Sequence, residues 1–476
     1  AGSNDENDGA ANFGYEITTG YIQDKWQATP ELELLAGLRV DAYTTDDAPA
    51  LNQSFTEDFG FANNATLDGE TLVQPRIGFN YTPDADWSVR GGLGIFSGGN
   101  PNVWLSNNYS ANNIDQVGAL ARAGRTISTF DGTLPNPIDL NTLTYSGAED
   151  GVPNFAGYAI PDIVYDAVAT GDGSNFELNY LDPDFKIPSD WKFALGTTWT
   201  PDFNTGESLF GGAWMFQADV LVSKSQDTAI VKRGDLVQTG TQTVNGVTVP
   251  TYDSPNMDTF VLTNADKSNE AFVASLGISK EWDSGWAATV GYAYSDAKDV
   301  SPMTSSVAFS NYNNRAFTDP QEEVLATSNY NIKHRFSGSV SYAKDFVKDY
   351  DTRFFAFFQH NSGRPYSLVD KNPNDYYGFT PYLEGGILLP GEKRNGHEGP
   401  SWTKVDLKIS QDLPGFREDD RAQVFMVIDN LTNLINSDWG VLENPSFPRT
   451  LSQTDSFSTG FDASAYEIRF GASYDF

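Results

Sequence analysis

Cysteine is absent from this chain of 476 residues, and histidine occurs only at His334, His360 and His397. Without thiols the chain forms no disulfide, no thiolate metal site and no cysteine nucleophile. Three separate histidines offer little to a zinc or haem site. The sequence also lacks the GxSxG, HExxH and P-loop patterns of common catalytic sites. We therefore expect neither an enzyme nor a cofactor-binding protein.

Basic residues are scarce as well. Lys and Arg together number 30, against 64 Asp and Glu, which gives a formal net charge of -34. Proteins hold nucleic acids mainly through basic side chains. We therefore expect no nucleic-acid partner.

Long apolar runs are also missing. No run of about 18 apolar residues occurs, so the sequence predicts no transmembrane helix. The first residues, AGSNDENDGAAN, lack the basic and apolar regions of a secretory signal. We expect either that a signal has been removed or that the chain begins partway through a longer protein.

The chain is rich in glycine and aromatic residues, which favour turns and strands over helices. It contains 43 Gly, 32 Phe, 22 Tyr and 10 Trp. Apolar residues at every second position predict thirteen strands. These cover residues 14–28, 31–45, 72–82, 86–97, 190–200, 209–224, 270–282, 285–297, 331–344, 350–361, 402–411, 420–431 and 464–476.

The last predicted strand shows the alternation most fully. Its large apolar side chains are Tyr466, Ile468, Phe470, Tyr474 and Phe476, and polar or small residues stand between them. A soluble strand averages about 5 to 6 residues, whereas a strand that crosses a bilayer needs about 9 to 11. The predicted strands are of the longer kind. We therefore predict an all-β fold, an antiparallel transmembrane β-barrel.

The connections between the predicted strands alternate between short and long along the whole chain. The long ones cover residues 46–71, 98–189, 225–269, 298–330, 362–401 and 432–463. Outer-membrane barrels have short periplasmic turns and long extracellular loops. Thirteen strands place the two chain ends on opposite sides, and an odd number cannot close by pairing its first and last strands antiparallel. We therefore expect the carboxy-terminal part of a larger barrel.

Four stretches resemble the carboxy-terminal half of TonB-dependent outer-membrane receptors. They are SGRPYS at 362–367, WTKVDLKISQDLP at 402–414, VFMVIDNLTNLINSDWG at 424–440 and YEIRFGASYDF at 466–476. The third is most similar to the Oar-like branch of that family. The resemblance implies a 22-stranded barrel, of which residues 1–476 would form about 13 strands. Nine strands, the plug domain and the TonB-contacting segment would precede residue 1.

The same resemblance implies location, function and partners. The protein would lie in the outer membrane of a Gram-negative bacterium and take up a scarce substrate, a peptide or other large solute, through a plugged barrel. Its partners would be outer-membrane lipid and lipopolysaccharide, the plug and remaining strands, the TonB complex and the barrel assembly machinery. A surface lipoprotein is a further candidate. Terminal strands that end on an aromatic residue resemble the assembly signal of such barrels, here Tyr466, Ile468, Phe470, Tyr474 and Phe476.

Two other functions fit the same strands. A passive porin or an autotransporter-type barrel would need neither a plug nor TonB. A surface structural or adhesive protein would use the barrel only to anchor its acidic loops. Within the motifs themselves, structural roles are favoured over ligand contact: Arg364 and Pro365 would shape a loop, and Asn430 and Asn433 would form turns.

The polar side of the predicted strands carries an excess of basic residues, assigned to the barrel lumen. They are Arg39, Arg76, Arg90, Lys192, Lys333, Arg335, Arg353, Lys404, Lys408 and Arg469. Only four acidic residues, Asp41, Asp219, Asp406 and Glu467, share that side. This basic wall would pair with acidic groups of a plug or draw anionic solutes inward. A wall that merely contacts water is the alternative.

The longest connection, residues 98–189, is the candidate extracellular recognition region. Its aromatic residues would stack on sugar or peptide, or would hold the loop together. They are Trp104, Tyr109, Tyr145, Phe155, Tyr158 and Tyr165.

Acidic clusters in the loops raise the question of loop-bound calcium. The opening NDENDG resembles a calcium loop, but the Glu expected at position twelve is absent when counting starts at Asn4. Neighbouring carboxylates are candidates for cations or for cation bridges to lipopolysaccharide. They are Asp46 with Asp47, Glu57 with Asp58, and Asp182 with Asp184. Solvation is the favoured interpretation.

Overall fold

The structure, a computed structural model, describes most of the chain. It covers residues 10–112, 119–122, 126–129, 138–139, 144, 177–203, 209–244, 246–255, 258–347, 350–371, 385–417, 420–452 and 455–476. Among these residues no helix is long and apolar enough to cross a membrane.

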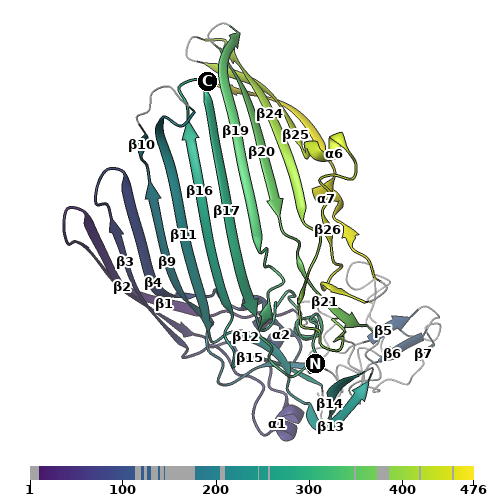
Figure 1. Ribbon diagram of the computed structural model, residues 1–476. Helices are drawn as coiled ribbons and strands as arrows, with labels where there is room; N and C mark the ends of the chain where they lie inside the picture. Colours follow the sequence, from purple (N-terminus) through teal and green to yellow (C-terminus); the bar gives the residue numbers. More distant parts are fainter. Residues whose placement is uncertain are drawn as a thin grey trace.

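One large antiparallel sheet dominates the architecture (Figure 1). Its strands follow the chain order, so each main strand pairs with the one before and the one after it. They are β1 (Glu16–Gln27), β2 (Leu32–Thr44), β3 (Thr71–Tyr81), β4 (Trp87–Ser97), β9 (Ser189–Trp199), β11 (Gly212–Gln226), β16 (Glu270–Glu281), β17 (Trp286–Asp299), β19 (His334–Val347), β20 (Tyr350–Asn361), β24 (Trp402–Pro414), β25 (Arg421–Asp429) and β29 (Glu467–Asp475). The thirteen predicted strands are all present, with ends within three residues of those expected.

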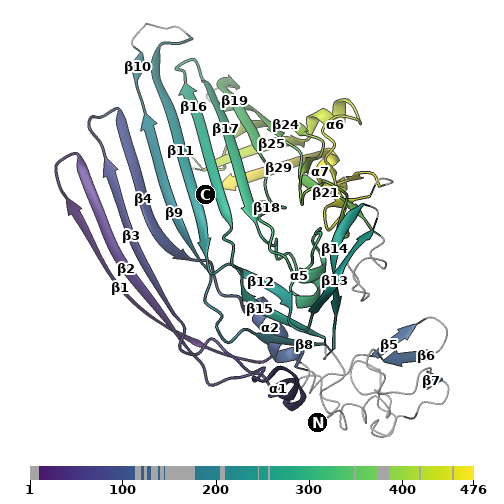
Figure 2. The ribbon, with the colours of Figure 1, turned by 60° about the horizontal axis from the view of Figure 1, so that its bottom comes forward.

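Two short strands widen the sheet: β10 (Asp202–Phe203) pairs with β11, and β18 (Ala326–Thr327) pairs with β17. The sheet is open, with β1 and β29 at its edges. It curves around an interior, as the turned view shows (Figure 2). The short connections lie at one end, called the turn end, and the long ones at the other, called the loop end (Figure 1). The carboxy terminus lies at the turn end.

The strand register gives the sheet two chemically different faces. Ser275 of β16 lies opposite Ala293 of β17, and the next residue, Leu276, lies opposite Tyr292. Because side chains alternate along a strand and paired residues share a side, the register extends both sets across the sheet. The side of Ser275 is called the polar face and the side of Leu276 the apolar face.

Large side chains of the apolar face are exposed rather than packed. They include Ile22, Ile77, Leu93, Phe193, Leu276, Val290, Phe336 and Phe470. Leu276 is 60% exposed and Phe470 is 78% exposed. Aromatic rings gather on this face near the turn end: Trp87 stacks on Trp199 at 5.3 Å, and Trp286 lies 4.6 Å from Tyr342. Such aromatic bands are typical of the boundary between membrane and water.

The long connections contain regular structure of their own. Their strands are β5 (Ala119–Arg122), β6 (Thr126–Thr129), β7 (Ile138–Asp139), β8 (Leu178–Leu181), β12 (Ala229–Arg233), β13 (Val237–Val244), β14 (Val247–Asp253), β15 (Thr259–Asn264), β21 (Pro365–Asp370), β22 (Ile387–Leu388), β23 (His397–Glu398), β26 (Glu443–Asn444), β27 (Thr450–Leu451) and β28 (Ser458–Thr459). Their helices are α1 (Gln53–Phe59), α2 (Asn102–Ser110), α5 (Ala308–Asn313), α6 (Leu431–Ile435) and α7 (Phe461–Ser464).

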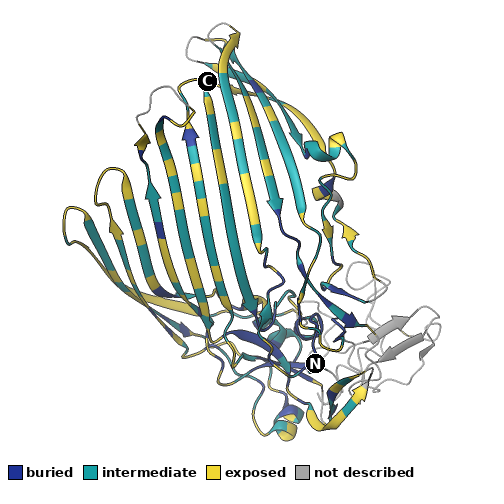
Figure 3. Cartoon of the chain, viewed as in Figure 1, coloured by how far each residue is buried: buried dark blue, intermediate teal, exposed yellow. Residues whose placement is uncertain are grey.

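The buried apolar core lies among these connections rather than in the sheet (Figure 3). Its members come from the ends of β2 and β3 and from five long connections: Tyr43, Leu67, Leu72, Leu105, Leu181, Phe185, Ile187, Ala229, Val231, Val249, Tyr252, Phe260, Leu262, Ala308, Tyr312, Phe317 and Ile387. Each large buried side chain contributes about 1.5–3 kcal/mol to folding. The five connections that supply this core therefore form one folded unit, called the loop domain.

The two faces of the sheet lead to a prediction about stability in a lipid bilayer. We expect Leu276→Lys to lower the free energy of unfolding in lipid vesicles by about 2–4 kcal/mol, because the ammonium group would lie in hydrocarbon near the middle of β16. The neighbouring change Ser275→Lys places the same charge on the polar face and should cost far less. Urea titrations followed by tryptophan fluorescence measure both, and equal losses would contradict the assignment of the faces.

Candidate binding site between the loop domain and the polar face

Strand pairing between different long connections holds the loop domain together. β15, from the connection after β11, pairs in parallel with β8, from the connection after β4. β12 pairs with β15 on the other side. Parallel pairing of β21 with β27 also attaches the connection after β25 to the loop domain. The loops are therefore interlocked and present a preformed surface.

Buried ion pairs reinforce the loop domain. Arg233 bonds both oxygens of Asp235 and, at 2.6 Å, also Asp258. Arg394 donates to Asp299 at 2.8 Å and so ties the connection after β20 to the end of β17. The pKa of Arg233 is raised above its usual value by these carboxylates, although its burial acts in the opposite direction. Removing one partner of such a buried pair typically costs about 3–5 kcal/mol.

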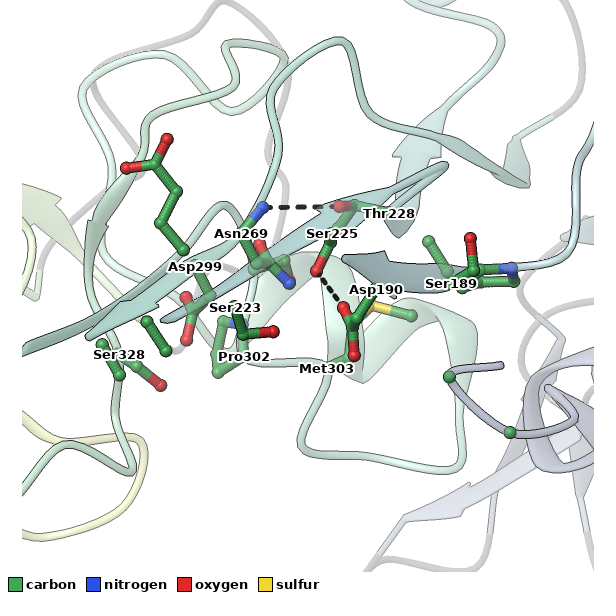
Figure 4. A pocket seen from close by; sticks show the side chains of 18 of the residues that line it. Ser189, Asp190, Ser223, Ser225, Thr228, Asn269, Asp299, Pro302, Met303 and Ser328 are labelled. Atoms are coloured by element: carbon green, nitrogen blue, oxygen red, sulfur yellow. Dashed lines mark hydrogen bonds between the residues drawn. The ribbon is translucent and has the colours of Figure 1, made fainter. Parts of the chain in front are cut away.

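A cavity of about 460 Å³ lies where the loop domain meets the loop ends of β9, β11, β16 and β17 (Figure 4). Sheet residues on its wall include Ser189, Asp190, Ser223 and Ser225. Loop residues on its wall include Pro302 and Met303. Pockets of this size are typical for small-molecule ligands. The cavity is therefore the candidate binding site.

Hydroxyl groups and carboxylates both contribute to the polar lining of this cavity. Asp190 is engaged because Ser225 donates to it at 2.7 Å (Figure 4). Two other lining hydroxyls, those of Ser189 and Ser301, are buried and have no hydrogen-bond partner among the described residues. A buried hydroxyl without a partner is costly, so these groups would bond a polar ligand readily.

The aromatic residues predicted to contact ligand lie in different places. Trp104 of α2 lines the cavity, and its Nε1 donates to the carbonyl oxygen of Ser305 at 3.0 Å. Tyr109 of α2 stacks on Phe13 at 4.3 Å and donates to the carbonyl oxygen of Asp47, so it holds the loop domain together. The other four lie outside the described residues: Tyr145, Phe155, Tyr158 and Tyr165.

The register brings the predicted basic residues to one face. Nine of the ten lie in paired positions on the polar face: Arg39, Arg76, Arg90, Lys192, Arg335, Arg353, Lys404, Lys408 and Arg469. The tenth, Lys333, immediately precedes β19. Whether this face borders a lumen stays a prediction.

Further carboxylates, beyond the four predicted from the sequence, neutralise much of this basic excess. Four of them lie on the polar face near strand ends: Asp190, Asp351, Asp412 and Asp429. Arg353 contacts Asp351 and Asp412 at 2.7 Å each, and Arg469 pairs with Asp429. They lie outside the strand middles, where the alternation of side chains does not assign a face. Six of the ten basic residues form an ion pair with a described carboxylate: Arg39, Arg90, Lys192, Arg353, Lys404 and Arg469.

Four of the ten basic side chains, Arg76, Lys333, Arg335 and Lys408, make no ion pair with any described residue. Arg76 lies over the ring of Phe96 at 5.2 Å, and Lys408 lies over Phe425 at 5.1 Å. Neither an ion pair nor a ring contact with a described residue is found for Lys333 and Arg335. These two cations lie at the loop end, beside the start of β19.

The motif at 424–440 forms a structural junction. Asn430 has positive φ and is only 2% exposed. Its Nδ2 donates to the carbonyl oxygens of Gly440 at 3.0 Å and Ser464 at 2.8 Å, while its Oδ1 accepts from Thr432. Its backbone N–H donates to Asp406 of β24. Asn430 therefore ties the end of β25 to β24 and to the residues just before β29.

The terminal strand has its expected alternation. Ile468, Phe470 and Tyr474 lie on the apolar face, paired with β25. Tyr466 and Phe476 flank β29 and are exposed. Their role in assembly stays a prediction.

Two of the candidate calcium carboxylates form hydrogen bonds within the loop domain. Asp47 accepts from the backbone N–H of Gly14 at 2.7 Å, and Asp182 accepts from Thr263 at 2.6 Å. No group of three or more His, Asp or Glu among the described residues is arranged to hold a metal ion. Residues 4–9, the NDENDG stretch, lie outside the described residues.

Comparisons with known proteins place these features in context. A family model described as "Outer membrane beta barrel domain" matches residues 1–379. The outer membrane transporter YddB from Escherichia coli superposes with a TM-score of 0.55 at 10% identity, over 97% of this chain and 45% of that one. The siderophore receptor PirA from Acinetobacter baumannii superposes with a TM-score of 0.48 at 10% identity, over 97% and 46%. The chain thus spans about half the length of these proteins. No curated protein sequence matches it.

The junction at Asn430 generates a stability prediction. We expect Asn430→Ala to lower the free energy of unfolding by about 2–4 kcal/mol, because it leaves several buried groups without partners and places alanine in the left-handed region. Asn433→Ala, within α6, removes only exposed bonds to Ser437 and Trp439 and serves as the control. Urea unfolding measures both. Equal effects would show that the buried network is not what stabilises this region.

Glu177, which precedes β8, generates a pH prediction. Burial raises the pKa of its carboxyl group to about 7, with partial opposition from Asn179 and Arg233. The proton is therefore bound more tightly in the folded state, and this contribution to stability is full below pH ~4.3 and lost as the pH rises through about 7. We expect the loop domain to exchange amide hydrogens more slowly at pH 5 than at pH 8, after correction for intrinsic rates. Glu177→Gln should reduce this difference; an unchanged difference would assign it to other groups.

Proposed function

The chain belongs to the outer membrane beta barrel domain family, and from this premise we propose that it is the barrel portion of a TonB-dependent receptor. In this proposal the receptor is of the Oar-like branch and takes up a scarce solute across the outer membrane. The observation that carries the proposal is the cavity between the loop domain and the polar face. A site at the loop end of the barrel wall would bind a solute before the solute passes along the polar face.

The open sheet supports a larger barrel. β1 and β29 are its two edges, and each leaves a row of backbone N–H and C=O groups without strand partners. Such groups cannot remain unpaired in hydrocarbon. We propose that further strands pair with both edges and complete a 22-stranded barrel, and that a plug domain fills it. The polar-face cations would then contact acidic groups of the plug or anionic solutes.

The remaining partners follow from the same proposal. The TonB complex would move the plug, the assembly machinery would read the terminal strand, and lipid and lipopolysaccharide would cover the apolar face. A surface lipoprotein would be a partner at the loop domain. Catalysis has no part in this function.

A peptide or other large solute is proposed as the substrate. The hydroxyls of Ser189 and Ser301, which have no partner among the described residues, can donate and accept hydrogen bonds, as peptide amide groups do. Trp104 adds an aromatic surface on the same cavity.

Two alternative functions make different demands on the loop domain. A passive porin needs an open mouth, whereas the loop domain is interlocked by strand pairing between its connections. An adhesive anchor would use the outer surface of the loops and would not need the cavity. The interlocked loops and the cavity together favour the receptor.

A genetic experiment tests this function. The medium of wild-type cells would be compared by mass spectrometry with that of strains lacking this protein, lacking TonB, or lacking both. We expect the same solutes to remain in all three deletion media, because the two proteins act in one pathway. Uptake that needs this protein but not TonB would support a porin, and uptake unchanged by its deletion would support a structural protein.

A variant in the cavity sharpens the test. Ser223→Arg should lower uptake of the identified solutes at least tenfold at an unchanged protein level, because Ser223 lies on the cavity wall and the added volume fills the site. Ser341→Arg, on the polar face near the turn end, is the matched control. Equal uptake by the two variants would contradict a role for the cavity.

A further inference from the structure

A second groove lies at the turn end of the sheet. Its volume is about 1120 Å³, and it is lined by residues of β16, β17 and β19 together with Leu209 and Gly211 from the connection before β11. Ala288 of β17 and Val340 of β19 line it and lie opposite each other on the apolar face. The apolar face of an outer-membrane barrel contacts lipid. The groove therefore borders the bilayer.

A buried cation, Lys280 of β16, lines this groove. The register places Lys280 on the apolar face, between Trp214 of β11 and Ala288 of β17. Lysines near a membrane boundary usually extend their ammonium group into water. Lys280 is instead only 4% exposed and forms no ion pair with a described residue. By contrast, Lys344, on the same face near the same end, is exposed.

Two indole rings enclose the ammonium group of Lys280. Its Nζ lies 5.1 Å from the ring centre of Trp214 and 5.3 Å from that of Trp282, and the two rings meet edge to face. Each indole N–H donates to the connection before β11: Trp214 to the carbonyl oxygen of Phe210 at 3.0 Å, and Trp282 to that of Leu209 at 3.1 Å. The two rings are therefore held in place by the protein itself.

The ammonium group of Lys280 retains unused hydrogen-bonding capacity. It donates to the carbonyl oxygen of Gly211 and, at 3.4 Å, to that of Ala213. An ammonium group has three N–H donors, so one of them has no partner among the described residues. A buried charge is costly unless an opposite charge pairs with it. Neither the rings nor the carbonyl groups supply a full negative charge, so an anionic group in the groove would be bound favourably.

Exposed carboxylates restrict which anionic group the groove would accept. Three of them line it: Asp202, Glu281 and Asp283. They would repel a ligand with net negative charge and would attract one that also carries a cation. A phospholipid with an amine in its headgroup carries both charges, and its acyl chains would lie along the apolar face.

We propose that this groove binds a zwitterionic phospholipid, with the phosphate on Lys280 and the amine beside the three carboxylates. Trp286, which also lines the groove, belongs to the aromatic band at the boundary between membrane and water. This band is the level at which phospholipid headgroups lie. Because the short turns of outer-membrane barrels are periplasmic, the lipid belongs to the periplasmic leaflet. The inference goes beyond the proposed function and does not depend on solute uptake.

Lipid binding to the purified full-length protein in mild detergent tests this site. Native mass spectrometry would follow titrations with phosphatidylethanolamine, with phosphatidylglycerol of the same acyl chains, and with inorganic phosphate. We expect phosphatidylethanolamine to bind most tightly, and about tenfold more weakly to Lys280→Met than to the wild type, because a charge-assisted hydrogen bond is lost. Lys344→Met removes a cation from the same face and end and should bind as the wild type does.

A second variant blocks the groove and leaves Lys280 in place. Ala288→Phe adds an apolar ring where the lipid would lie, and it should also weaken binding of phosphatidylethanolamine about tenfold. If Lys280 served only to tether the connection before β11, Ala288→Phe would leave lipid binding unchanged. This variant also serves if Lys280→Met does not fold.

Three outcomes would overturn the site. They are equal binding of phosphatidylethanolamine by the wild type and both groove variants, equal losses in Lys280→Met and Lys344→Met, and binding of inorganic phosphate as tight as that of the lipid. Phosphatidylglycerol binding as tightly as phosphatidylethanolamine would overturn the role of the carboxylates. None of these results changes the outcome of the uptake experiment, so the site and the receptor can fail separately.

Discussion

Backbone hydrogen bonding is the constraint on which the rest of this structure depends. In hydrocarbon every N–H and C=O group needs a partner within the protein, so strands must pair with neighbours along their whole length. Thirteen strands meet this demand through one continuous antiparallel ladder. The ladder turns every second side chain to the same side. The same ladder therefore explains two features: the alternation of Leu276 with Ser275, and the unpaired backbone groups at the edge strands β1 and β29.

The large apolar side chains of the sheet are exposed, so they form no packed core within the protein. The packing that stabilises the protein must therefore lie outside the sheet. The loop domain supplies it, with its own apolar core and buried ion pairs such as Arg394 with Asp299. The loop domain also links neighbouring strands at their loop ends. The side-chain oxygen of Asn269, which precedes β16, accepts from the backbone N–H of Val300, which follows β17. Loops fixed in this way can hold a cavity of constant shape.

Local pattern predicted the sheet, since alternation and turn residues lie within each strand and its nearest connection. It could not predict the loop domain, because β8 pairs in parallel with β15, a partner from another connection. The neutralising carboxylates were missed for a related reason. Asp412 lies near the end of β24, where alternation is weak evidence for a face, and only the register brings it to Arg353. The cavity likewise joins Ser189 to Ser301, residues that no spacing connects.

Charge pairing along the polar face limits where selectivity can arise. A cation already bonded to a carboxylate, as Arg90 is to Asp219 at 2.7 Å, exerts little net field on a passing solute. The repulsion of the 64 acidic residues would in turn keep anions away from the loops. An anionic solute therefore needs a local group of unpaired cations to overcome that field. Arg335 lies opposite Asn361, the last residue of β20, where the long connections meet the wall. In the proposed receptor, discrimination between solutes would thus be decided mainly at the loop end.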